Sequence, residues 1–264
     1  MDVIRYVANK NRNYKRFHVD FTYFSYKKDS GSDRFPFTMN VKGGGFLTFE
    51  EIKNNEEINE FINKGNYNLG LLGYTDHSQI HCSIVADTAA MILKKFGYSE
   101  HDIELAKIAG YMHDIGNAIN RNHHAEYGAL LANDLLKDTN MSLEDRVTVI
   151  AAIGNHDEST GSPEDVISAA LIIADKTDVR RSRVRQKERS AFDIHDRVNY
   201  AVTDSKLKID EEKSVIALNL QIDENICSMY DYFEIFLDRM MFCRKSAEIL
   251  GTTFKLTVNG RKVL

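Results

Sequence analysis

The sequence has little cysteine and no long apolar run. Its three cysteines, Cys82, Cys227 and Cys243, show no CxxC spacing and cannot all pair, which fits a reducing compartment better than a disulfide scaffold. The apolar stretch Val166–Ala174 is far too short to span a bilayer. The first residues also lack the basic and then apolar pattern of a signal peptide. We therefore expect a cytoplasmic protein that has no membrane partner.

An excess of positive charge is absent as well. The 264 residues carry 34 Lys and Arg against 39 Asp and Glu, a net charge of -5, which argues against a general nucleic-acid binder. Hydrophobic residues make up 43% and charged residues 28%, an ordinary globular composition. A chain of this length is ample for a buried core.

The pattern of the sequence divides the chain into three regions. Residues 1–45 are predicted to be a β-rich extension, because Phe17–Phe24 is aromatic and partly alternating, as in a strand. Residues 46–205 show helical spacing and are predicted to form a helical core. Residues 206–264 are predicted to form a strand–helix–strand lobe. The Phe- and Met-rich stretch 229–242 in its helix indicates core packing or a homodimer interface.

Several polar residues in the helical region are suited to begin helices. Thr48 with Glu51 has the spacing of a capping box, which predicts a helix from there through about Lys64. Three further helix starts are predicted on the same grounds, at Thr75-Asp76, at Ser142 with Asp145, and at Ser162-Pro163.

The most informative stretch is Tyr111–Asn117, in which His113 stands beside Asp114. Imidazole and carboxylate together hold divalent first-row metals. Adjacent residues do not share a face of a helix or strand, so we expect this pair at a helix end, where Gly116 could let the chain turn. A second pair, His195-Asp196, has no following glycine and no ligand partners nearby.

Histidines and carboxylates recur at the ends of the predicted helices. Side chains at helix ends can converge at the mouth of a bundle, which makes a metal site of this set: His81, His113, Asp114, His124, His156 and Asp175. Three neighbours leave alternatives open. His77 is a further ligand or a solvent-facing side chain, and His123 competes with His124. Asp157 binds metal or only hydrogen-bonds a ligand histidine.

The order of these residues resembles the HD superfamily of metal-dependent phosphohydrolases over residues 70–190. His124-Ala-Glu-Tyr-Gly128 matches the superfamily's His-x-x-x-Gly element, and Ala174–Asp178 matches its closing aspartate helix. The binuclear branch keeps two extra histidines, which are His124 and His156 here. The resemblance implies a mainly α protein: an HD-domain helical bundle with a small α+β lobe formed by the N- and C-terminal segments.

The resemblance also implies two divalent transition-metal ions (Fe, Mn, Co or Zn). The first would be held by His81, His113, Asp114 and Asp175, and the second by His124 and His156, with Asp114 bridging both. A metal-bridging hydroxide would then hydrolyse a phosphoester or phosphoanhydride, which we expect to belong to a nucleotide. The alternatives are a di-iron oxygenase of the HD type and a nucleotide-binding sensor without catalysis.

Four residues outside the ligand set are candidates for contact with the substrate. HD-GYP proteins, which belong to the binuclear branch, carry lysine where this chain has Asn117, so we do not expect cyclic-di-GMP as the substrate. Asn117 itself is assigned to substrate binding. Lys176 adjoins a ligand and is a catalytic candidate for stabilising charge. In the basic stretch that follows, Arg181 and Arg185, at i and i+4, are predicted to bind phosphate.

Overall fold

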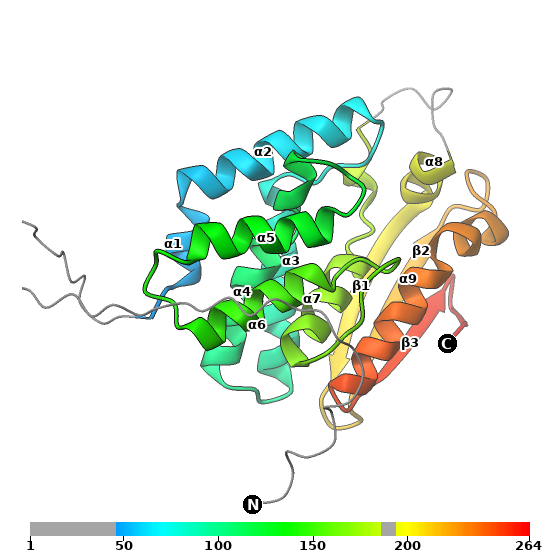
Figure 1. Ribbon diagram of the computed structural model, residues 1–264. Coiled ribbons are helices and arrows are strands. Elements are labelled where there is room, and N and C mark those ends of the chain that lie inside the picture. Colours follow the sequence, from blue (N-terminus) through cyan, green and yellow to red (C-terminus); the bar gives the residue numbers. More distant parts are fainter. Residues whose placement is uncertain (1–45, 186–193) are drawn as a thin grey trace, which may run out of the picture. The chain divides into compact units, whose positions relative to one another are not determined.

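The structure is a computed structural model that describes residues 46–185 and 194–264. The β-rich extension expected at residues 1–45 lies outside these ranges, as does any share of it in the α+β lobe. The described chain is mainly helical and carries a small four-stranded sheet near its C-terminal end, which confirms the predicted fold class (Figure 1). Over the same residues, no helix combines the length and apolarity that a membrane span requires.

The helical part runs from α1 to α7. Its elements are α1 (Phe49–Lys53), α2 (Glu56–Leu71), α3 (Gln79–Lys95), α4 (Glu100–Met112), the 3-10 turn η1 (Ile115–Ala118), α5 (His124–Leu136), α6 (Leu143–Gly154) and α7 (Val166–Thr177). In this part α3 packs against α4 and α7, α5 packs against α6, and η1 lies between α2 and α5. A short turn, η2 (Arg181–Arg183), follows α7.

The apolar run noted in the sequence belongs to α7. Every side chain from Ile167 to Ala174 is buried. A helix that is apolar all round needs neighbours on every side, and α7 contacts α3, α4 and α6 of the bundle together with α9 of the C-terminal lobe. It is therefore the central helix that delivers Asp175 to the interior.

Two predicted helix starts are confirmed in the structure. Thr48 and Glu51 form the expected capping box, and Ser142 accepts a hydrogen bond from the Asp145 amide. The predicted helix from Thr48 is nevertheless two helices, because the side chain of Asn55 caps a new one at Glu56.

Two predicted helix starts are wrong by a few residues. The helix expected at Thr75-Asp76 begins at Gln79, where Ser78 is the cap and Asp76 accepts from its hydroxyl at 2.7 Å. The helix expected at Ser162-Pro163 begins at Val166. Here Asp165 accepts from the amide of Ser168 while the Ser168 hydroxyl accepts from the amide of Asp165. A reciprocal cap satisfies two backbone donors, whereas proline only fixes a torsion angle.

The C-terminal part contains α8 (Ile194–Ala201), β1 (Val202–Asp210), β2 (Val215–Ile222), α9 (Met229–Ile249), β3 (Thr253–Val258) and β4 (Arg261–Lys262). The sheet order is β1-β2-β3-β4. β2 and β3 are parallel, with α9 as their crossover, whereas β1 and β4 pair antiparallel at the two edges. In Figure 1, α9 lies along one face of the sheet.

The sequence missed β1. Only Leu207 and Ile209 are apolar in its second half, because an edge strand exposes polar side chains to water. In α9, Tyr232, Phe236 and Met240 are buried, so these residues serve the core. A homodimer interface stays a prediction.

Candidate metal centre

The His113-Asp114 pair lies where one helix ends and a tighter turn begins. His113 is the last residue attached to α4, and Asp114 directly precedes η1. Since the chain changes its helical geometry between them, both side chains turn inward, and both are buried. The expectation that this pair marks a helix end is confirmed.

Two glycines allow the helices around this pair to touch through their backbones. A Cβ on Gly116 would lie 2.0 Å from the carbonyl oxygen of His124, and one on Gly110 would lie 2.8 Å from Cα of Ala86. Gly116 has no positive φ angle, so it supplies space and not the turn that the sequence suggested. These close approaches bring His124 and α3, which carries His81, to the His113-Asp114 pair.

The four buried histidines share one arrangement. The Nδ1 of each faces an oxygen that only accepts: Asp178 for His81 (2.7 Å), and the carbonyls of Gly110 for His113 (2.8 Å), Arg121 for His124 (3.1 Å) and Ile153 for His156 (2.6 Å). Nδ1 must therefore carry the hydrogen, and in a neutral ring Nε2 keeps its lone pair. Four such nitrogens point into one buried space, as metal-binding imidazoles do.

Asp114 stands between the histidines, with one oxygen toward each pair. Its Oδ2 lies 3.2 Å from Nε2 of His113 and 3.8 Å from Nε2 of His81. Its Oδ1 lies 3.7 Å from Nε2 of His124 and 4.0 Å from Nε2 of His156. A carboxylate placed in this way could bind two cations at once.

Asp175, at the end of α7, divides its oxygens differently. Oδ1 faces inward, 3.4 Å from Nε2 of His81 and 3.7 Å from Nε2 of His113. Oδ2 accepts from Lys176 at 2.8 Å, and the same ammonium reaches Glu158 at 2.6 Å. The buried ammonium of Lys176 holds Oδ2 of Asp175, so Oδ1 of Asp175 stays directed at the histidines.

The chemistry of the cluster fits a metal ion. Buried polar atoms normally have hydrogen-bond partners, yet within the described ranges Nε2 of His81, Nε2 of His113 and Oδ2 of Asp114 have none. The Nε2 atoms of His124 and His156 face each other at 3.1 Å. Two sets of residues could each hold a metal ion: His81-His113-Asp175 and His113-Asp114-His156. Within each set, the ligand atoms lie within 4.8 Å of one another. Divalent cations would satisfy all of these atoms.

The electrostatics of the cluster also favour the binding of a cation. Burial alone would lower the pKa of His113, but the carboxylates of Asp114 and Asp175 raise it to about 10. Burial favours the neutral form of Asp114 too, yet the surrounding histidines, His113 first, hold its pKa well below the ordinary value. The carboxylates thus attract a cation to His113, whether a proton or a metal ion.

The structure distinguishes the residues that the sequence left open. His124 is buried in the cluster, whereas the neighbouring side chain of His123 is 64% exposed and lies near Glu126. Asp157 approaches the outer nitrogen of His124 at 3.6 Å, on the side away from the cluster. His77 precedes α3 and does not share a helix face with His81, although their ring centres are 5.4 Å apart.

The residues predicted to bind substrate have other contacts in the structure. Asn117 is buried and donates to Oδ1 of Asp114 at 2.8 Å, so it fixes the bridging carboxylate. The shared helix face expected for Arg181 and Arg185 is wrong, because the chain leaves the helix after Thr177. Arg181 donates to the Tyr200 carbonyl, and Arg185 donates to carbonyls of the segment before α3. Phosphate binding by these arginines stays a prediction.

Sequence reasoning missed three residues around the cluster. Asp178 accepts from His81, Glu158 joins Lys176 to Arg239 of α9, and Arg121 lies 3.3 Å from Nε2 of His124. Asp178 stands one turn after Asp175, a spacing that could have marked it. No sequence pattern could have marked Glu158, since its partner on α9 is 81 residues away.

Comparisons with known proteins agree with this geometry. Residues 79–182 match the model of the HD domain. This region of the chain therefore matches the HD domain, whose family members are generally metal-dependent hydrolases. Over 193 residues the chain is 28% identical to the uncharacterized protein MJ1020 of Methanocaldococcus jannaschii, an alignment that covers 64% of this chain and 74% of that protein.

Proposed function

We propose that the protein is a cytoplasmic phosphohydrolase of the binuclear HD branch, which cleaves a phosphoester or phosphoanhydride bond of a nucleotide. The observation that carries this proposal is the convergence of four histidine Nε2 atoms on the two oxygens of Asp114. Two divalent transition-metal ions (Fe, Mn, Co or Zn) would supply a bridging hydroxide as nucleophile and would stabilise charge on the phosphate oxygens.

Asp114, Asn117 and Lys176 hold the proposed ligand set in place. Asp114 links the two proposed positions, and Asn117 fixes the rotation of its carboxylate through the 2.8 Å bond to Oδ1. Lys176 holds the outer oxygen of Asp175, so that the inner oxygen stays directed at His81 and His113. When no substrate is bound, the buried positive charge of Lys176 also offsets the negative charges of Asp175 and Glu158.

Metal analysis followed by a phosphate-release screen tests this function. We expect more than one transition-metal ion per chain after metal supplementation, and phosphate release from at least one nucleotide. A chain that holds at most one metal ion contradicts the binuclear proposal. Oxygen consumption without phosphate release would instead favour the di-iron oxygenase, and nucleotide binding without turnover would favour the sensor.

A further inference from the structure

Arg121 differs from the other arginines around the cluster. Those donate to carboxylates or backbone carbonyls of the protein: Arg180, Arg181, Arg183, Arg185 and Arg239. Arg121 has no carboxylate within ion-pair distance among residues 46–185 and 194–264, and its Nη1 contacts only Asn117 and His124. A guanidinium without a carboxylate partner is suited to bind an oxyanion, since its fork matches phosphate.

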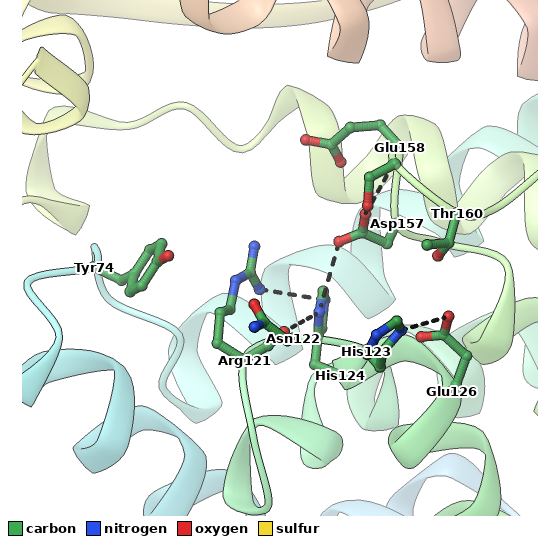
Figure 2. A pocket seen from close by; sticks show the side chains of 10 residues that line it. Tyr74, Arg121, Asn122, His123, His124, Glu126, Asp157, Glu158 and Thr160 are labelled. Carbon is green, nitrogen blue, oxygen red and sulfur yellow. Dashed lines mark hydrogen bonds and ion pairs between the residues drawn. The ribbon is translucent and has the colours of Figure 1, made fainter.

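The position of Arg121 is set by two contacts. Its guanidinium carbon lies 5.3 Å from the ring centre of Tyr74, a cation–π contact. Its own carbonyl accepts from Nδ1 of His124, which ties the backbone of Arg121 to a residue of the cluster. Figure 2 shows the guanidinium between the Tyr74 ring and the His124 imidazole. A fixed positive charge therefore stands at the edge of the cluster.

A polar cavity of about 350 Å³ opens beside this charge. Side chains that can bind hydroxyl groups line it, including Asn122, Asp157 and Thr160 (Figure 2). His124 contributes to the same wall, so the cavity reaches the metal cluster. A ligand here would meet the cluster and Arg121 at one end and hydrogen-bonding groups elsewhere.

The contact between Arg121 and His124 explains how the guanidinium becomes available. Nε2 of His124 accepts from Nη1 of Arg121 at 3.3 Å. This nitrogen has one lone pair, so it cannot accept from Arg121 and bind a metal ion at the same time. A metal ion bound at this nitrogen would break the bond between His124 and Arg121, whereas the contact of Arg121 with Tyr74 does not involve His124. The N–H group of Arg121 would then be available to a phosphate oxygen.

We propose that Arg121 binds the phosphate of the substrate at the edge of the cluster, and that the hydroxyl-bearing sugar that carries this phosphate occupies the cavity beside it. The assignment rests on the proposed function, because it places the phosphate next to the residues that would hold the metal ions. It names the substrate class as a sugar phosphate, free or within a nucleotide.

The test is phosphate binding by the metal-loaded full chain. Arg121→Ala should raise the Kd of inorganic phosphate, measured by titration calorimetry, by roughly ten- to hundred-fold, because a charge-assisted contact is lost. Metal content by elemental analysis should not change. Arg121→Lys should lie between, since it keeps the charge and loses the fork. The matched control is Arg244→Ala, which removes one exposed positive charge from α9 and should bind phosphate as the wild type does.

An unchanged Kd in Arg121→Ala, or an equal rise in Arg244→Ala, would overturn the assignment. So would loss of metal in Arg121→Ala together with wild-type phosphate binding in Arg121→Lys, which would make Arg121 a positioning residue for His124. The sugar is tested separately: ribose 5-phosphate should bind the wild type roughly three- to tenfold more tightly than methyl phosphate. Equal affinities would remove the sugar from the proposal.

The outcomes also separate this assignment from the proposed function. A wild-type protein that binds phosphate through Arg121 but hydrolyses no phosphate ester would contradict the function and leave the assignment in place. A wild-type protein that hydrolyses phosphate esters, with an Arg121→Ala variant equal to it in binding and turnover, would contradict the assignment alone.

Discussion

The two ends of the cluster are built from different chemistry. At the carboxylate-rich end, His81 and His113 face Asp175 and one oxygen of Asp114. At the imidazole end, His124 and His156 face each other and the second oxygen of Asp114. Asp114 directs one carboxylate oxygen to each end.

This difference sets the charge that each end prefers. The carboxylates raise the pKa of His113 to about 10, whereas burial, together with the neighbouring histidines and Lys176, lowers the pKa of His156 to about 3. Burial likewise lowers the pKa of His124. The carboxylate-rich end attracts a cation strongly, and the imidazole end offers neutral nitrogens with little negative charge. We therefore expect a metal ion to bind more tightly at the carboxylate-rich end.

Removing Asp114 should abolish the difference in metal binding between the two ends, because both ends depend on its carboxylate. Asp114→Ala should empty both proposed positions and lower phosphate release by roughly 10³-fold or more. Asp114→Asn should behave nearly the same, since the amide keeps the size and loses the charge that offsets the repulsion between two dications. Metal content and phosphate release of the purified variants check both outcomes.

The control for this experiment is the other His-Asp pair. Asp196 lies in the first turn of α8 and belongs to neither of the two ligand sets found among the described residues. Asp196→Ala should leave metal content intact and cost about 0.3–1 kcal/mol of unfolding free energy, as expected for an acidic residue near a helix start. Metal loss in this variant, with metal retained in Asp114→Ala, would show that the site is built around the wrong pair.

Removing either histidine of the imidazole end should have the next largest effect. His124→Ala and His156→Ala should each lose one metal ion per chain, because His81, His113 and Asp175 remain to hold the other. Elemental analysis gives the stoichiometry, and circular dichroism shows that the variants are folded. If a folded variant lost all its metal, the two ends would not be independent positions.

The sequence predicted the members of both ends because they are marked by local patterns. His113-Asp114 adjoin a glycine, His124 precedes Gly128 by four residues, and Asp175 follows a run of apolar residues. It did not reveal the reason for the glycines, since the close approach of Gly116 to the His124 carbonyl depends on how η1 packs on α5. Spacing identifies candidates, whereas tertiary packing decides which atoms face one another.

The surroundings of the cluster were harder to predict for the same reason. Arg181 and Arg185 have helical spacing in the sequence, but the chain beyond α7 contains only a short turn before it extends. β1 was missed because its exposed edge carries polar residues. Arg121 contacts His124, which lies 3 residues away in the sequence, and Asp178 contacts His81, which lies 97 residues away. Arg121 stands three residues before His124 and Asp178 three residues after Asp175, but neither spacing alone reveals the contact.

A smaller effect is expected from Asp178, the carboxylate behind the carboxylate-rich end. Burial favours the neutral acid, but hydrogen bonds from His81 and Arg180 hold the pKa of Asp178 well below its ordinary value. An anion at Nδ1 makes Nε2 of His81 a stronger ligand. Asp178→Asn keeps an acceptor for His81 and loses the charge, so it should weaken metal binding at this end by roughly 10- to 100-fold and leave the imidazole end occupied.

Arg180 provides the matched comparison, because among the described residues it contacts the cluster only through Asp178. Its half-exposed guanidinium donates to Asp178, while the buried Arg183 remains to hold the Asp178 carbonyl at 2.7 Å. Loss of a partly exposed ion pair costs about 1 kcal/mol or less, so Arg180→Ala should weaken metal binding by roughly fivefold at most. Competition with a chelator of known affinity measures both variants on one scale. If Arg180→Ala weakened binding as much as Asp178→Asn, the charge of Asp178 would not be what strengthens His81. The orientation of the Asp178 carboxylate, which Arg180 and Arg183 maintain, would then be what strengthens His81.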